Sequence, residues 1–217
     1  MKTRDSIFIP HLEEKIHTDF VHRPHPIFFE LEDYAREKNV PIISPASGAV
    51  LQNLLSLVQP KHVWELGTGI GYSTLWMMFG SIGSKYTSLD RNEKQASVLD
   101  ESIQSAFGES APSLHRIDAW ALDYMYGNVQ TWKEADFFFI DCDKVTYPEL
   151  WDLIFFHVPK GTRILFDNML WHGRVLDPNS DKPSDKAVLA TWKRVKESGA
   201  SFTLFPVGDG ILLTQKN

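Results

Sequence analysis

The sequence predicts an α/β fold: a seven-stranded, mostly parallel sheet with helices on both faces and an antiparallel hairpin at the C-terminal end. Short apolar runs alternate with helical patterns from residue 61 onward, which is typical of parallel strands joined by crossover helices. Two runs, 137–140 and 163–166, are apolar throughout, as strands covered on both faces are. The last two runs are separated only by residues 206–210, which cannot hold a crossover helix and therefore predict a hairpin.

Length and composition favour one domain. The 217 residues are 43% hydrophobic and 23% charged, which is ordinary for a compact chain with a full core. No internal repeat, low-complexity tract or linker divides the sequence. We therefore expect a single domain over residues 1–217, with an N-terminal helical segment at 1–42 and an α/β core at 43–217.

Charge and cysteine content restrict the partners and the compartment. A formal net charge of −6 weighs against nucleic acid or an anionic membrane as a partner, although it is compatible with a local basic patch. No apolar segment has the length of a signal peptide or a membrane span. The single cysteine, Cys142, fits a reducing compartment and is interpreted as a small buried residue. We expect a soluble, cytoplasmic protein.

Helices are predicted before the alternating region. Residues 11–39 are rich in charge and carry Phe28, Leu31 and Tyr34 at helical spacing, so they predict one or two helices, separated by prolines. The next helix should begin at Ser44-Pro45, where a hydroxyl N-cap precedes proline at the first helical position. Apolar residues at helical spacing continue from there to residue 58.

The alternating region should contain all seven strands and five further helices. Strand runs are short and apolar, whereas helical runs space their apolar residues by three or four positions. The strands are expected at 62–66, 86–89, 114–117, 137–140, 163–166, 202–205 and 211–214. The helices are expected at 72–79, 93–107, 119–126, 147–157 and 185–198. Residues 176–186 contain two prolines, an asparagine and two serines and predict a surface loop close to the site.

Oxygen-bearing side chains stand where two buried strands should end. Asp141 follows one strand, and Asp167 and Asn168 follow another, at the sheet edge where open α/β folds bind ligands. Three such oxygens suit Mg²⁺, Ca²⁺ or Mn²⁺ better than zinc. Lys144 lies three residues after Asp141, so a metal and an amine at this edge would suit chemistry on an oxygen that must lose its proton. The alternative is that these residues only cap the following helix and loop.

A glycine-rich turn follows the first strand. Gly67, Gly69 and Gly71 lead into a helix, so that a ligand can approach backbone amides at its N-terminus, although a purely structural turn is the alternative. Asp90 ends the next strand, 90 − 71 = 19 residues after the last glycine, where it could accept both hydroxyls of a ribose or cap the following helix. Asp118 ends the third strand and could meet an adenine edge or serve as an N-cap.

Four motifs follow one another in a characteristic order. They are Glu65-Leu-Gly-Thr-Gly-Ile-Gly-Tyr-Ser73, Phe139-Ile-Asp-Cys-Asp-Lys144 with Tyr147, Asp167-Asn-Met-Leu-Trp-His-Gly173 and Pro206-Val-Gly-Asp-Gly-Ile-Leu-Leu213. Together they resemble the cation-dependent S-adenosylmethionine O-methyltransferases, which include catechol and caffeoyl-coenzyme A O-methyltransferases. The resemblance covers residues 43 to 216 and implies a Rossmann-like class I methyltransferase fold. The chain departs from the family at Cys142, which replaces an alanine, and at Val145-Thr146, which replaces a more polar pair.

The resemblance implies a role for each motif residue. Asp141, Asp167 and Asn168 would hold a divalent cation, Mg²⁺ or else Mn²⁺ or Ca²⁺, and Lys144 would be the catalytic base. S-adenosyl-L-methionine would lie along Glu65, Gly67, Gly69, Gly71, Ser73, Asp90, Asp118, Ala119 and Asp141. Trp171 and His172 follow the metal residues closely and could wall the acceptor pocket, although Trp171 could equally be core and His172 a solvated loop residue.

The expected chemistry favours a chelating acceptor. A phenol with a pKa of about 10 is mostly protonated at neutral pH, and a bound cation lowers that pKa and orients the acceptor. Of the roughly six coordination places on Mg²⁺, three protein oxygens leave room for two neighbouring substrate oxygens and one water. The sequence therefore favours a catechol-like vicinal dihydroxy compound, with Lys144 accepting the phenolic proton.

Three other functions are left open by the sequence. A tRNA base such as 5-hydroxyuridine also presents adjacent oxygens, and some bacterial proteins similar to this one methylate it, but the acidic balance disfavours tRNA. A module that binds the cofactor without turnover would need neither Lys144 nor a complete ligand set. An NAD-dependent oxidoreductase is disfavoured because the turn reads G-x-G-x-G and not G-x-G-x-x-G.

The family likeness also implies a homodimer. Apolar residues near the N-terminus could form the contact between subunits or could instead cap the core. These residues are Ile7, Phe8, Ile9, Phe28 and Phe29.

Overall fold

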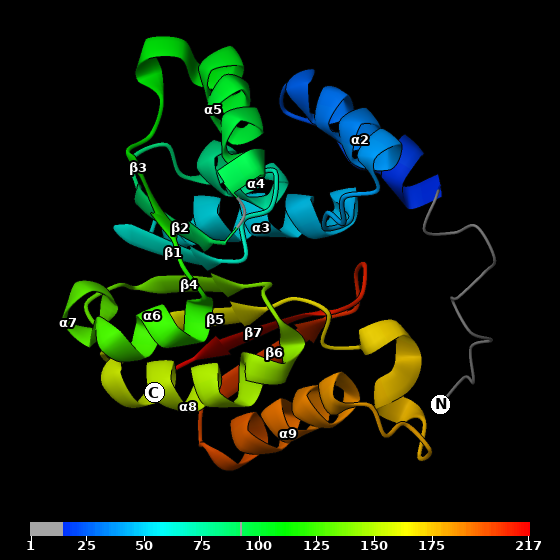
Figure 1. The fold of residues 1–217 in the computed structure, drawn as a ribbon, viewed down its shortest axis with the longest axis vertical. Coiled ribbons are helices and arrows are strands. Elements are labelled where there is room, and N and C mark those ends of the chain that lie inside the picture. Colours follow the sequence, from blue (N-terminus) through cyan, green and yellow to red (C-terminus); the bar gives the residue numbers. More distant parts are fainter. Residues whose placement is uncertain (1–14, 92) are drawn as a thin grey trace.

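The computed structural model describes residues 15–91 and 93–217, without the side chains of residues 93–95. Its sheet has seven strands in the order β3-β2-β1-β4-β5-β7-β6 (Figure 1). The first five strands are parallel, and β7 is antiparallel to both β5 and β6, which confirms the predicted fold class. The strands are β1 His62–Leu66, β2 Lys85–Asp90, β3 Leu114–Asp118, β4 Phe137–Ile140, β5 Arg163–Phe166, β6 Ser201–Phe205 and β7 Ile211–Gln215.

Helices cover both faces of the sheet (Figure 1). One face carries α2 Ile27–Lys38, α3 Pro45–Val58, α4 Tyr72–Gly80 and α5 Glu93–Phe107. The other carries α6 Ala121–Gly127, α7 Val129–Trp132, α8 Tyr147–His157 and α9 Pro183–Glu197. The remaining turns are a π-helix, η1 Ile16–Phe20, and the 3-10 segments η2 Gly108–Ser110, η3 Lys144–Thr146 and η4 Trp171–Leu176.

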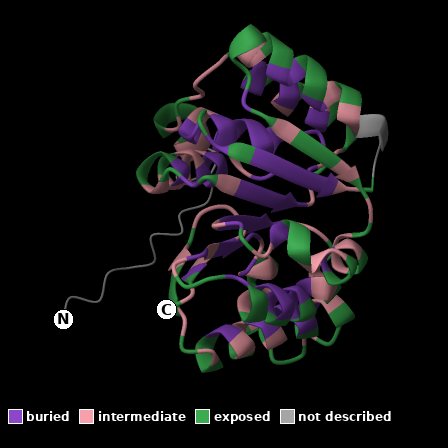
Figure 2. Cartoon of the chain, turned by 90° about the vertical axis from the view of Figure 1, so that its left-hand side faces the viewer, coloured by how far each residue is buried: buried purple, intermediate pink, exposed green. Residues whose placement is uncertain are grey.

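The core is divided by the sheet into two apolar clusters. Phe137 and Phe139 of β4 face the cluster under α2 to α5, whereas Phe138 and Ile140 face the cluster under α6 to α9. All four side chains are fully buried, as the unbroken apolar run predicted. Figure 2 shows that buried residues predominate in the strands between the two helical layers. The central strands are therefore rigid supports for whatever follows their carboxyl ends.

The N-terminal helix α2 is held against α4 by aromatic and polar contacts. The Phe28 ring centroid lies 4.4 Å from that of Trp76 and 5.6 Å from that of Tyr72. The Tyr72 hydroxyl donates to Glu32 Oε1 at 2.6 Å, and the Arg23 guanidinium forms a bidentate ion pair with the same carboxylate. Because Tyr72 is the first residue of α4, these contacts connect the N-terminal segment to the start of the helix after the glycine turn.

Most element boundaries agree with the predictions. The Ser44 side chain accepts a hydrogen bond from the amide of Ser47 and caps α3, as expected. The predicted helix at 119–126 begins only at residue 121, after an extended Trp120. The predicted loop at 176–186 is shorter, because 3-10 segment η4 reaches residue 176 and α9 starts at Pro183, whose ring suits the first turn of a helix.

Some predictions reach beyond the described residues. Ile7, Phe8 and Ile9 lie outside them, and of the other two proposed dimer residues Phe28 is fully buried in the core while Phe29 is 55% exposed. The homodimer and the single domain over residues 1–217 stay predictions. None of the helices within the described residues has the length and apolar character needed to cross a bilayer.

Candidate active site

The carboxyl ends of three neighbouring strands meet at the centre of the sheet. Leu66 of β1 pairs with Ile140 of β4, and Ile140 pairs with Phe166 of β5. The next residues, Gly67, Asp141 and Asp167, therefore lie side by side. The strand order reverses between β1 and β4, and such a switch point is where open α/β sheets bind ligands.

A large cavity opens at this switch point. Its volume is about 1370 Å³. One end is lined by the glycine turn and by the residues after β2 and β3, and the other by the residues after β5, the β6–β7 turn and the segment before α3. These stretches are 67–70, 72–73, 89–91 and 119–123 at the first end, 141–144 between the two, and 40–44, 167–168, 170–173, 175–176 and 208–209 at the second.

Two features fix the glycine turn: hydrogen bonds to Asp90, and the close contact of Gly67 with the backbone that follows β4. The amides of Thr68 and Gly69 donate to Asp90 Oδ2 at 2.9 and 2.8 Å. Gly67 has a φ of +97°, and a Cβ there would lie 2.3 Å from the backbone oxygen of Asp141. Only glycine lets the turn lie this close to the end of β4.

Glu65 lies behind the cavity wall, because β1 turns its side chain into the protein. It is 1% exposed, and the hydroxyls of Ser73 and Thr74 each donate to one of its carboxylate oxygens at 2.5 Å. Burial raises the pKa of Glu65 to about 8. Glu65 therefore supports the first turn of α4 from beneath.

The residues predicted to contact the cofactor fall into two groups. Three of them, Glu65, Gly71 and Asp118, do not line the cavity. A Cβ on Gly71 would lie 2.2 Å from the Leu99 side chain, so this glycine serves the packing of α4 on α5. Asp118 is exposed and does not cap α6, whose N-cap is Trp120. Those that line the cavity are Gly67, Gly69, Ser73, Asp90, Ala119 and Asp141.

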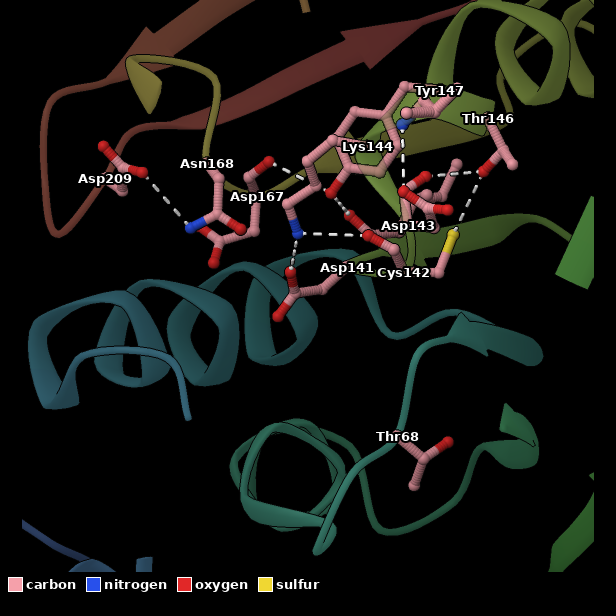
Figure 3. Close-up of polar contacts among 12 residues, drawn as sticks. Thr68, Asp141, Cys142, Asp143, Lys144, Thr146, Tyr147, Asp167, Asn168 and Asp209 are labelled. Atoms are coloured by element: carbon pink, nitrogen blue, oxygen red, sulfur yellow. Dashed lines mark hydrogen bonds and ion pairs between the residues drawn. The ribbon is translucent and has the colours of Figure 1, made fainter. Parts of the chain in front are cut away.

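The structure brings the predicted metal residues and Lys144 together (Figure 3). Lys144 Nζ lies 2.6 Å from Asp141 Oδ1 and 3.2 Å from the Cys142 backbone oxygen. Asn168, with a φ of +59°, donates from Nδ2 to Asp209 Oδ2 at 3.5 Å. Asp167 is 3% exposed, and its Oδ1 is buried with no hydrogen-bond partner among the described residues.

Burial and like charge perturb both carboxylates. Burial raises the pKa of Asp141, although the Lys144 ammonium opposes the shift. Burial and the negative charge of Asp141 raise the pKa of Asp167 to about 7. A buried carboxylate oxygen without a partner, beside a second carboxylate and an amide, fits a hard divalent cation, which would favour the ionised form of both acids.

Trp171 and His172, which were predicted to wall the acceptor pocket, both line the second end of the cavity. Trp171 is half-buried and His172 exposed. Both have positive φ angles, 48° and 53°, which are uncommon for residues other than glycine. The His172 amide donates to Asp209 Oδ1 at 2.5 Å, so the β6–β7 turn supports this segment.

Some lining residues were not assigned from the sequence. Asp209 lies in the fourth motif, which predicts no role for its carboxylate. Trp120 directly follows Ala119, and this position next to a predicted cofactor residue is the signal that could have indicated it. The Arg91 guanidinium lies 3.8 Å from the Trp120 ring centroid, and both residues line the cavity. Cys142 is half-buried, whereas the sequence predicts a buried residue. The reason is that it lies just beyond the carboxyl end of β4 and lines the cavity.

Comparison with known proteins agrees with this geometry. The family model described as O-methyltransferase matches residues 21–217. A catechol O-methyltransferase of Niastella koreensis is 34% identical over 144 residues, which span 65% of this chain and 64% of that protein. A caffeoyl-CoA O-methyltransferase of Stellaria longipes is 30% identical over 181 residues, 80% of this chain and 75% of that protein.

Solved structures show the same architecture. An O-methyltransferase from Bacillus cereus in complex with SAH superposes with a TM-score of 0.80 at 25% identity, covering 94% of this chain and 96% of that one. The match therefore extends over the sheet, both helical layers and the cavity. The chain belongs to the O-methyltransferase family, as its four sequence motifs predicted.

Proposed function

We propose that this protein transfers a methyl group from S-adenosylmethionine to one hydroxyl of a catechol-like vicinal dihydroxy compound, with the help of a divalent cation. The observation that carries the proposal is the group formed by Asp141, Asp167, Asn168 and Lys144 at one end of a cavity whose other end is a glycine turn. The names of the relatives, catechol and caffeoyl-CoA O-methyltransferases, point to the same class of acceptor.

The first end of the cavity is suited to the cofactor. Gly67 and Gly69 allow a ligand to approach the turn, and the Asp90 carboxylate, already fixed by two amides of that turn, is placed at the end of β2 for a ribose. Ala119 and Trp120 offer a flat apolar surface for a base next to it. The solved Bacillus cereus relative carries SAH, the demethylated form of the methyl donor.

The second end is suited to the acceptor and a cation. Asp141, Asp167 and Asn168 would hold Mg²⁺, or alternatively Mn²⁺ or Ca²⁺, through oxygen atoms. When bound, the cation would stabilise the negative charge that develops on the acceptor oxygen. Trp171 walls the space beside this group and gives an aromatic acceptor a surface to pack against.

Lys144 is placed to handle the proton. Its ammonium lies within hydrogen-bond distance of Asp141 and 6.0 Å from the Trp171 ring centroid, so it faces the space between the metal residues and the aromatic wall. A hydroxyl bound there could pass its proton to Lys144, acting as a general base, before it attacks the methyl group in line. Asp141 then orients Lys144 as well as binding the cation.

The decisive experiment is methyl transfer from labelled S-adenosylmethionine to 3,4-dihydroxybenzoate, with Mg²⁺ and then with excess chelator. We expect turnover that the chelator abolishes and that is reduced about 100-fold or more in Asp141→Asn. Asp152→Asn is the matched control, because Asp152 pairs with Arg194 on the surface of α8 and α9 and does not line the cavity. Turnover that persists without a metal would contradict the cation, and no turnover in any condition would contradict this acceptor class.

A further inference from the structure

Asp185, on the first turn of α9, is contacted by side chains of residues 171–180, the segment that carries the Trp171 wall of the acceptor end. It accepts hydrogen bonds from Trp171 Nε1 at 2.6 Å and from Ser180 Oγ at 2.6 Å. The Arg174 guanidinium lies 3.3 Å from the same oxygen that Trp171 contacts. The residue is 2% exposed and does not itself line the cavity. Asp185 thus acts on the site only through its neighbours.

The segment that Asp185 holds has an uncommon backbone. Trp171 and His172 both adopt positive φ angles, a conformation that persists only where surrounding contacts enforce it. On one side Asp209 accepts from the His172 amide, and on the other Asp185 accepts from the Trp171 indole. The Arg174 guanidinium also lies over the indole, 4.6 Å from its centroid. The indole is therefore held at its N–H by the Asp185 carboxylate and over its face by the Arg174 guanidinium, and these two charged groups also contact each other.

We propose that Asp185 is a positioning residue that fixes the Trp171 indole as the wall of the acceptor site and so decides which of two adjacent hydroxyls is methylated. The inference rests on the proposed function. In this role Asp185 acts through Trp171 and does not contact the acceptor, the cofactor or the reacting atoms.

Regioselectivity is sensitive to this wall for a simple reason. A vicinal dihydroxy ring can present either oxygen to the methyl group by turning over, and the two poses differ mainly in where the remaining ring substituent lies. Trp171 is the large rigid surface beside the metal residues, so the position of its indole favours one pose over the other. A small difference in how the two poses pack against the indole changes the ratio of the two methylated products severalfold.

The test measures the ratio of 3-O-methyl to 4-O-methyl product formed from 3,4-dihydroxybenzoate. Asp185→Ala removes the acceptor of the indole hydrogen bond, and Trp171→Phe keeps an aromatic ring but removes the donor. We expect each variant to change the ratio by about threefold or more, and the double variant by no more than the larger single change. Asp185→Asn, which retains one acceptor oxygen, should restore part of the wild-type ratio. Asp152→Asn, which breaks another carboxylate pair of α9, should leave it unchanged.

A product ratio separates positioning from a general loss of structure. Fewer folded molecules lower the total rate but cannot change the ratio, whereas a displaced wall changes both. An unchanged ratio in Asp185→Ala would overturn the proposal, and so would strictly additive effects of the two single variants.

A second measurement does not require turnover. Trypsin can cut after Arg174, whose guanidinium is half-buried against Asp185, but not after Lys182, because Pro183 follows. Limited trypsinolysis of the full chain should cleave the peptide bond between residues 174 and 175 about tenfold faster in Asp185→Ala than in the wild type or Asp152→Asn. Equal cleavage rates would contradict the proposal that Asp185 anchors the segment that contains Trp171 and Arg174. Absence of wild-type turnover would instead contradict the proposed function, and the cutting rates alone would then decide the role of Asp185.

Discussion

Lys144 lies between Asp141 and the Trp171 ring, and its proposed role as the base can be tested by pH. At neutral pH, Lys144→Met should lower kcat about 100-fold or more, because no amine remains to take the phenolic proton. The deficit should shrink as the pH approaches about 10, where a phenol ionises unaided. The measurement is a kcat profile against pH for both proteins.

The control for this prediction is Lys160→Met, which removes an exposed lysine away from the cavity and should behave as the wild type. Calorimetry should show unchanged affinity for S-adenosylhomocysteine in Lys144→Met. A deficit that is the same at every pH would argue for an electrostatic role of Lys144 and against its role as the base.

Glu65 makes a prediction about stability. Its pKa is about 8 in the folded protein, against 4.5 for an ordinary glutamate, so between these values the folded state binds a proton that the unfolded state has released. The free energy of unfolding should therefore fall as the pH rises through this window, by up to about 5 kcal/mol. Glu65→Gln cannot titrate and should lack this part of the pH dependence.

Urea denaturation of the ligand-free protein at several pH values checks this prediction. Glu134→Gln is the matched control, because Glu134 is exposed, and its curve should run parallel to that of the wild type. Parallel curves for the wild type and Glu65→Gln would show that Glu65 has an ordinary pKa.

Among the elements, the glycine turn between β1 and α4 carries the strictest geometric demand. Gly67→Ala would place a Cβ 2.3 Å from the backbone of Asp141 at a φ of +97°, so neither a rotamer change nor a small shift relieves it. We expect a loss of about 2–4 kcal/mol in unfolding free energy and weaker binding of S-adenosylhomocysteine. Chemical denaturation and calorimetry would measure both.

Gly83→Ala is the comparison at a site where the new methyl group meets nothing within 4 Å. It should change stability by no more than about 0.5 kcal/mol. Similar stability for the two alanine variants would mean that the end of β4 can yield to the turn.

The elements also show where sequence reasoning succeeds. The strands β1, β4 and β5 and the helices α5 and α8 have the predicted bounds, because their apolar runs, continuous in the strands and spaced by three or four positions in the helices, are interrupted by glycine, proline or carboxylates near both ends. Helices α6 and α9 begin two residues away from their predicted starts. Residues 119–121 are apolar throughout and so do not mark where the helix begins, and residues 177–182 are polar and carry no apolar period.

At the scale of the whole molecule, the N-terminal segment contains a largely buried ion pair between Arg23 and Glu32, and the carboxylate of this pair also contacts the α/β core. The side chains of Arg23 and Glu32 are only 7% and 16% exposed, and Glu32 also accepts from Tyr72 at the start of α4. Arg23→Met would leave this carboxylate without its cation. We expect a loss of about 2–4 kcal/mol in unfolding free energy by chemical denaturation.

Arg36→Met serves as the control, since the Arg36 and Asp33 side chains are 75% and 66% exposed. An exposed pair contributes little, so this variant should stay within about 0.5 kcal/mol of the wild type. Equal stability of the two methionine variants would mean that the Arg23–Glu32 ion pair contributes little to the stability of the fold.

Four sequence motifs identified the family, and the sequence by itself predicted the fold class and the group around Asp141, Asp167, Asn168 and Lys144. It could do so because parallel strands bring their carboxyl ends to one edge, so residues that follow two buried apolar runs must meet there.

Tertiary structure alone decided which of these residues face the cavity and what holds them. Glu65 points behind the wall, Asp209 supports His172 from the β6–β7 turn, and Asp185 reaches the Trp171 indole from α9. These contacts join side chains from separate elements, and their directions depend on packing between segments that no local pattern describes.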